Sequence, residues 1–172
     1  MDRTRIAGFA LAITIIGVAL ASPTDAQVDY QCTDATPKGA YSVQITGQIL
    51  TPASAAGSVS GIALTTFDGF GNLTQIDHVV HNGVVPVEEW RPAIGSYKVN
   101  SDCTGTLTFT PHPADPADSG PPLKVNFVLT RGGAQIVEVV SGSPSAPAFT
   151  ANIVATGFRL TGQLPPYGSV NQ

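Results

Sequence analysis

The side chain with the most versatile chemistry in this chain is His78, which lies in a segment where polar and apolar residues alternate. If that segment is a strand, His78 shares a face with Ile76 and Val80 and points into the core. A histidine in an apolar, partly enclosed space can act as an acid, a base or a ligand anchor. We favour two simpler interpretations, a core histidine that is hydrogen-bonded to a neighbour or a surface residue, because position alone does not make a catalyst.

Glu138 is the second residue that could do chemistry, because the same alternation places it on one face with Ile136 and Val140. A carboxyl group among apolar neighbours is disfavoured in its charged form and can serve as a general acid. Val137 and Val139 make the opposite face equally apolar, however. We favour the interpretation in which these valines point inward and Glu138 is solvated.

Three further side chains complete the set of candidate binding residues. Arg159 could pair with Glu138 across neighbouring strands, as a structural ion pair or as a ligand clamp. Tyr97 would take part if a barrel cavity carried out catalysis. Trp90 stands beside Arg91 in a predicted loop, where an exposed aromatic ring suits recognition. For this ring we favour a structural role, in which it covers the end of the fold.

The chain carries no recognised catalytic or cofactor motif. It has no Gly-x-Ser-x-Gly elbow, phosphate-binding loop, dinucleotide fingerprint or His-Glu-x-x-His pair. The turn at 68–72 offers oxygens, but its spacing is not that of a calcium loop. Of the eight Lys and Arg residues, Arg3 and Arg5 lie at the N-terminus and the others are scattered, so that no basic stripe exists. We therefore expect no metal, no cofactor and no nucleic-acid partner, and the lack of motifs argues against an enzyme.

Alternation with a period of two is the main structural signal along the rest of the chain. The composition agrees with it, because 18 Gly and 14 Pro suit tight turns and a charged content of 12% does not suit long helices. A proline-rich loop at 111–122 interrupts the pattern. About eight segments are expected to be strands: 41–46, 59–67, 73–81, 95–99, 104–110, 123–130, 135–140 and 149–160.

These strands predict a single all-β domain over residues 27–163, followed by a flexible tail at 164–172. Short sequential connections favour an antiparallel up-and-down arrangement. An open sheet of about eight strands would leave two exposed edges, so we expect it to close into a barrel or to fold over into a β-sandwich. We favour the barrel, because an up-and-down order suits closure.

The first 26 residues have the three-part pattern of a secretory signal peptide. A short basic start precedes an apolar run at 6–21, and small residues allow cleavage after Ala21 or Ala26. The run is shorter than the ~20 residues that a membrane-spanning helix needs. We therefore expect a secreted protein, extracellular or periplasmic, with no stable membrane insertion after cleavage.

Export changes the interpretation of Cys32 and Cys103, the two cysteines of the chain. In an oxidising compartment, two thiols in a small domain most often pair. A disulfide would close a loop of about 70 residues, which the chain-entropy model values at roughly 4 kcal/mol. We favour this bridge over the alternatives, two buried free thiols or part of a metal site.

Two motifs resemble a group of small secreted, mostly bacterial all-β proteins of unknown function. They are Phe-Asp-Gly-Phe-Gly-Asn at 67–72 and Tyr-Lys-Val-Asn-Ser-Asp-Cys-Thr-Gly at 97–105, preceded by Cys32 and a Gly-Ala-Tyr strand at 39–41. The resemblance covers the whole domain and implies that the two cysteines pair, but it implies no activity. A more distant, architectural likeness is to lipocalins and to the barrel of allene oxide cyclase, although no lipocalin Gly-x-Trp signature lies near the first strand.

Three functions fit these observations. The first is a non-enzymatic secreted barrel that binds a small apolar molecule or an extracellular protein partner. The second is a cofactor-free cyclase or isomerase with His78, Tyr97 and Glu138 as participants. The third is a structural envelope or surface protein with a filled interior, in which aromatic side chains pack together: Tyr41, Tyr97, Phe109 and Phe127. The first two functions require a cavity, and we favour the first.

Overall fold

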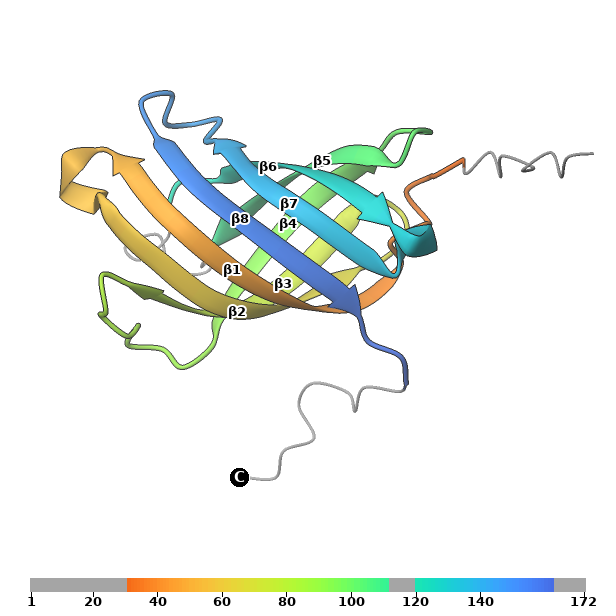
Figure 1. The fold of residues 1–172 in the computed structure, drawn as a ribbon, viewed down its shortest axis with the longest axis horizontal. Coiled ribbons are helices and arrows are strands. Elements are labelled where there is room, and N and C mark those ends of the chain that lie inside the picture. The colour runs from red at the N-terminus through yellow and green to blue at the C-terminus, as the bar shows by residue number, and fades with distance from the viewer. Residues whose placement is uncertain (1–30, 112–119, 163–172) are drawn as a thin grey trace, which may run out of the picture.

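A computed structural model of the 172-residue chain describes residues 31–111 and 120–162. Eight antiparallel strands follow one another around a closed barrel, because β1 pairs with both β2 and β8 (Figure 1). The elements are β1 (Gly39–Thr51), η1 (Ala53–Ala55), β2 (Gly57–Phe67), β3 (Asn72–His81), β4 (Arg91–Val99), β5 (Thr104–Pro111), β6 (Leu123–Thr130), η2 (Arg131–Gly133), β7 (Gln135–Gly142) and β8 (Thr150–Arg159).

The predicted up-and-down barrel is therefore confirmed, and the alternative of a β-sandwich is wrong. The predicted signal peptide at 1–26 and the predicted tail at 164–172 lie outside the described residues. Within the described part of the chain, no helix is long and apolar enough to cross a membrane. Strand β4 begins at Arg91, earlier than the alternation alone indicates, because its first residues, Arg91 and Pro92, pair with Asp77 and Ile76 in the middle of β3.

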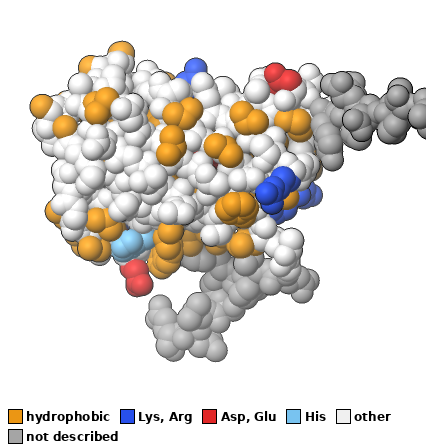
Figure 2. Space-filling model, in the orientation of Figure 1, with side chains coloured by type: hydrophobic (Ala, Val, Ile, Leu, Met, Phe, Trp, Pro, Cys, Tyr) orange, Lys and Arg blue, Asp and Glu red, His pale blue; other side chains and the backbone are white. Residues whose placement is uncertain are grey.

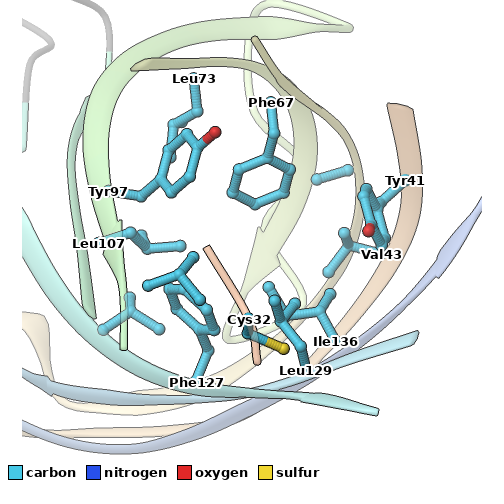
Figure 3. Close-up of a cluster of buried hydrophobic side chains, with 13 residues drawn as sticks. Cys32, Tyr41, Val43, Phe67, Leu73, Tyr97, Leu107, Phe127, Leu129 and Ile136 are labelled. Atoms are coloured by element: carbon cyan, nitrogen blue, oxygen red, sulfur yellow. The ribbon is translucent and has the colours of Figure 1, made fainter. Parts of the chain in front are cut away.

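One end of the barrel is filled with side chains. Tyr41, Phe67 and Tyr97 are buried there and meet edge to face, with ring centroids 5.4 and 5.0 Å apart (Figure 3). Edge-to-face contacts between aromatic rings add to the stabilisation that burial of their apolar surface provides. Gly105 is required in this layer, because a Cβ atom at its position would collide with the ring of Phe127.

The chain that precedes β1 closes this filled end. Cys32 and Cys103 form the predicted disulfide, with Cα atoms 4.9 Å apart, and this bond ties residues 31–38 to the turn between β4 and β5. The Asp34 carboxylate accepts hydrogen bonds from the Lys98 ammonium and the Val99 amide, both at 2.7 Å. The hydrogen bond from Lys98, followed by that from Val99, lowers the pKa of Asp34. These contacts place the N-terminal segment across the end that lies at the right of Figure 1.

The outer surface of the barrel is unusually apolar on the β7–β8 side. Val137, Val139, Val154 and Phe158 point outward from these strands and are 42 to 53% exposed. Figure 2 shows hydrophobic side chains distributed over this face. Both faces of these strands therefore carry apolar residues, and alternation by itself does not tell which face is inside.

Candidate functional site

The other end of the barrel is hollow. A cavity of about 370 Å³ lies between the strands, and inward-facing side chains of all eight strands line it. Its mouth is surrounded by the β1–β2 turn with η1, by the β3–β4 and β7–β8 connections, and by residues 120–122, which precede β6 (Figure 1). The volume falls within the range of about 300–1,000 Å³ that is typical of small-molecule sites.

The inward side chains at this end leave space between the strands, whereas those at the filled end pack together. Ile45, Val79, Val140 and Ala155 line the cavity, while the rings of Tyr41, Phe67 and Tyr97 lie in the buried core of the other end. Phe109, which the filled-barrel hypothesis grouped with the aromatic core, packs against that core and also lines the cavity wall. The barrel is thus filled in one half and hollow in the other, and it is neither fully packed nor an open channel.

Glu138 faces this cavity from β7. Its neighbours in the ladder are Phe127 of β6 and Ala155 of β8, which are both apolar. The side chain is half-buried, because its exposed part faces the cavity. Within the described residues the carboxyl group forms no hydrogen bond and no ion pair. Desolvation by the surrounding protein raises the pKa of Glu138 from 4.5 to about 7.

The interpretation that Glu138 is solvated is therefore wrong. Val137 and Val139 point to the outside, whereas Ile136 is fully buried and Val140 lines the cavity. The inward face of β7 consequently carries a carboxyl group between two aliphatic side chains.

A second polar group faces the cavity from the opposite wall. Asp77 of β3 is buried, and its Oδ1 atom accepts hydrogen bonds from Arg91 Nη2 at 2.7 Å and Nε at 3.0 Å. Its Oδ2 atom accepts a longer hydrogen bond of 3.3 Å from Gln75, whose amide oxygen accepts one from Thr65 at 2.8 Å. Buried charges are tolerated when they are paired and hydrogen-bonded. This network is therefore satisfied without a ligand.

His81, the last residue of β3, also lines the cavity. Its Nε2 atom is buried and has no hydrogen-bond partner among the described residues. An imidazole nitrogen can donate or accept a hydrogen bond, depending on its tautomer. Together with Glu138, His81 leaves polar atoms that a bound molecule could satisfy.

His78 lies on the outer surface, so the interpretation that it points into the core is wrong. Its Nδ1 atom is 2.6 Å from the carbonyl oxygen of Glu89, and its ring meets the Trp90 ring edge-on with centroids 6.2 Å apart. The expectation that Trp90 covers the barrel end is also wrong, because this ring packs against the outer face of β3. The parity of β3 is inverted relative to the expectation because Ile76 and Val80 face outward, where the surface tolerates them.

Tyr97 and Arg159 belong to the filled end and do not line the cavity. The Tyr97 hydroxyl donates to the Asp34 carbonyl at 2.7 Å and accepts from the Gly69 amide at 3.0 Å, and burial raises its pKa. Arg159 donates to the Tyr41 hydroxyl from Nη2 and Nε, at 2.9 and 3.1 Å.

The proposed ion pair between Arg159 and Glu138 is absent, because the β7–β8 register places Glu138 opposite Ala155, at the other half of the strand. Glu138 is therefore the one candidate binding residue from the sequence that lines the cavity. Sequence reasoning missed four polar residues in its wall: Gln75, Asp77, His81 and Arg91. Three of the four could have been found from β3, whose odd-numbered positions combine the apolar Leu73 and Val79 with the polar Gln75, Asp77 and His81.

Among the described residues, no group of three or more His, Cys, Asp and Glu side chains is arranged to hold a metal ion. Comparison of the chain with protein-family models, with curated proteins and with solved structures finds no match. The chemistry of the site is therefore interpreted from its own geometry.

Proposed function

We propose that this protein binds a small, largely apolar molecule in the hollow half of its barrel. The observation that carries the proposal is the apolar cavity of about 370 Å³, which opens at one end of a barrel that is densely packed at the other. Such a cavity is large enough for one small ligand. A fold whose only task was structural would gain stability by filling this space, because cavities lose transfer and dispersion energy.

Binding is proposed rather than catalysis because the polar groups of the cavity are not organised around a reaction centre. Asp77, Arg91 and Gln75 satisfy one another. Among the described residues, Glu138 is hydrogen-bonded to no second acid or base. General acid–base catalysis needs positioned groups that act together on the reacting atoms.

The proposal includes secretion, outside the cell or in the periplasm, and membership of the small secreted all-β group that the motifs at 67–72 and 97–105 resemble. The disulfide between Cys32 and Cys103 supports an oxidising compartment. The signal-peptide pattern at 1–26 supports export. The cavity at one end of a closed up-and-down barrel supports a lipocalin-like mode of binding, by analogy of architecture alone.

The test is binding of an uncharged apolar fluorophore, N-phenyl-1-naphthylamine, to the protein purified under non-reducing conditions. We expect saturable fluorescence enhancement from one site. Ala155→Phe projects a ring into the cavity and should weaken binding at least about tenfold, which corresponds to about 1.4 kcal/mol. Asn152→Phe adds the same ring at an exposed position of β8 and should leave the affinity within about twofold of wild type, close to the accuracy of such comparisons.

Absence of saturable binding to the wild type would overturn the proposal, as would equal loss of affinity in both variants. Circular dichroism of Ala155→Phe establishes that the barrel is folded. Native mass spectrometry of the protein isolated from its host then identifies any molecule that co-purifies with it.

A further inference from the structure

Among the described residues, Glu138 is the carboxylate of the cavity wall that has no cation beside it. The other carboxylate in the wall, Asp77, is matched by Arg91. The ladder neighbours of Glu138 on either side are Phe127 and Ala155, which can neither donate a hydrogen bond from their side chains nor carry a charge. A carboxylate in such surroundings is stabilised only by a partner that reaches it from inside the cavity.

The Lys and Arg residues that the structure describes do not provide that partner. Apart from Arg3 and Arg5, every Lys and Arg residue lies within the described part of the chain. Arg91 is the member of this set that lines the cavity, and Asp77 already binds it. The others act elsewhere: Lys98 pairs with Asp34, Arg159 binds Tyr41, Lys38 lies over the Phe70 ring, and Lys124 and Arg131 are exposed.

We propose that the molecule bound in the cavity is an apolar amine, whose protonated nitrogen forms an ion pair with the Glu138 carboxylate. This inference rests on the proposed function, because it assigns the chemistry of the ligand to the same cavity. A single ammonium group supplies the missing charge and donates up to three hydrogen bonds. A charge-assisted hydrogen bond of this kind is about twice as strong as a neutral one.

The rest of the cavity fits the remainder of such a molecule. Ile45, Val79, Val125 and Ile153 line the same cavity as Glu138 with aliphatic surface. A compact hydrocarbon body would bury its surface against these side chains. His81 Nε2, which has no partner within the described chain, offers one further hydrogen-bonding atom.

An anionic ligand fits the same wall less well. Arg91 already donates two hydrogen bonds to Asp77, so an incoming carboxylate would share this guanidinium with a buried carboxylate. The same carboxylate would face the unpaired Glu138, and two like charges in one cavity raise the cost of ionising either group.

The experiment compares three molecules that share one hydrocarbon chain: decylamine, 1-decanol and decanoate. Each is titrated at pH 8 against bound N-phenyl-1-naphthylamine, and its affinity is obtained from displacement. We expect wild-type protein to bind decylamine at least about tenfold more tightly than decanol, a difference of about 1.4 kcal/mol. Glu138→Gln keeps the shape of the side chain and removes its charge, so it should abolish this preference. Glu89→Gln, an identical change at an exposed position, should retain it.

The possible outcomes distinguish failure of the proposed binding function from failure of the inference that the ligand is an amine. If the fluorophore does not bind the wild type, the proposed function itself fails. If the fluorophore and decanol bind but decylamine shows no advantage, the cavity binds ligands and the amine inference is overturned. Tightest binding by decanoate would also overturn it, and would assign the ligand contact to Arg91. The comparison of decylamine with decanol needs only the wild-type protein, so it does not depend on the folding of a variant.

Discussion

Arg91 lies directly opposite Asp77 in the β3–β4 ladder and donates two hydrogen bonds to a single oxygen of its carboxylate. Glu138 faces the same cavity from β7, on the opposite wall of the eight-stranded barrel, and has no cation beside it within the described residues. One carboxylate is therefore neutralised by the fold, while the other depends on what enters the cavity. We therefore expect the paired Asp77 to stabilise the folded protein, and the unpaired Glu138 to lower its stability and to contribute to ligand binding.

Arg91→Met should destabilise the protein by about 3 kcal/mol, because it leaves the buried Asp77 carboxylate without its partner. Adding Asp77→Asn should recover much of this loss, since no unpaired charge then remains. Urea unfolding at pH 7 measures both. Lys98→Met breaks the ion pair with Asp34 in a place where Lys98 is largely exposed, and should cost no more than about 1 kcal/mol. Equal losses in the two single variants would contradict the contrast between a buried and an exposed pair.

Glu138→Gln should raise stability, and the gain should depend on pH. The pKa of Glu138 is raised in the folded state, from 4.5 to about 7, so the folded protein retains a proton that the unfolded chain has lost between these values. Stability of the wild type therefore falls as the pH rises from about 4.5 to about 7, relative to the variant.

The gain should approach at most about 3 kcal/mol above pH 7 and vanish below pH 4.5. Urea unfolding at pH 4, 6 and 8 measures it, and Glu89→Gln provides the control. The inward side chains of the neighbouring strands β6 and β8 add no titrating group, and the ionisable groups across the cavity are Asp77, His81 and Arg91. A stability difference that stays constant with pH would show that Glu138 is solvated as an ordinary surface carboxyl.

Affinity for decylamine should fall as the medium is acidified, if the ligand is an amine. Below pH 7 the empty cavity holds a protonated Glu138, so binding of the cation must release one proton. The linked loss is about tenfold per pH unit until the carboxyl group of the complex is itself protonated. Fluorophore displacement between pH 5 and 8 measures this slope. Glu138→Gln should show no such slope, and a slope that persists in that variant would assign the proton to another group.

Replacing both cysteines by alanine should lower the free energy of unfolding by about 4 kcal/mol, because the bond closes a loop with a sequence separation of 71 residues. The loss should come with exposure of the filled end, since the disulfide holds residues 31–38 across it. Hydrogen exchange should therefore increase first at the amide of Val99, which donates its hydrogen bond to the Asp34 carboxylate of this segment. A double variant that is as stable as the wild type would show that the other contacts of Asp34 and Arg159 suffice to hold the segment.

Much of the fold could be predicted from the chain alone, because its signals are local. Leu123, Val125, Phe127 and Leu129 alternate with more polar residues, and these four side chains do point inward along β6. Short turns rich in glycine and asparagine join neighbouring strands, which leaves few arrangements other than a meander. Two cysteines with no third could pair only with each other within the chain.

The site was decided by the tertiary structure. In β3 and β7 both faces carry aliphatic residues, so a period of two identifies a strand without showing which face is inside. That choice depends on the neighbouring strands: Arg91 and Thr65 satisfy the polar face of β3 only after the register has brought them beside it.

The sequence alone likewise did not predict whether the barrel is hollow. A cavity forms only when eight strands surround a common space that their inward side chains do not fill. Secondary structure follows from the order of residues along one strand, whereas a cavity and an unpaired charge are properties of residues that are distant in sequence. For this reason the sequence determined the barrel and its disulfide, and the packing decided that Glu138 faces a largely apolar cavity.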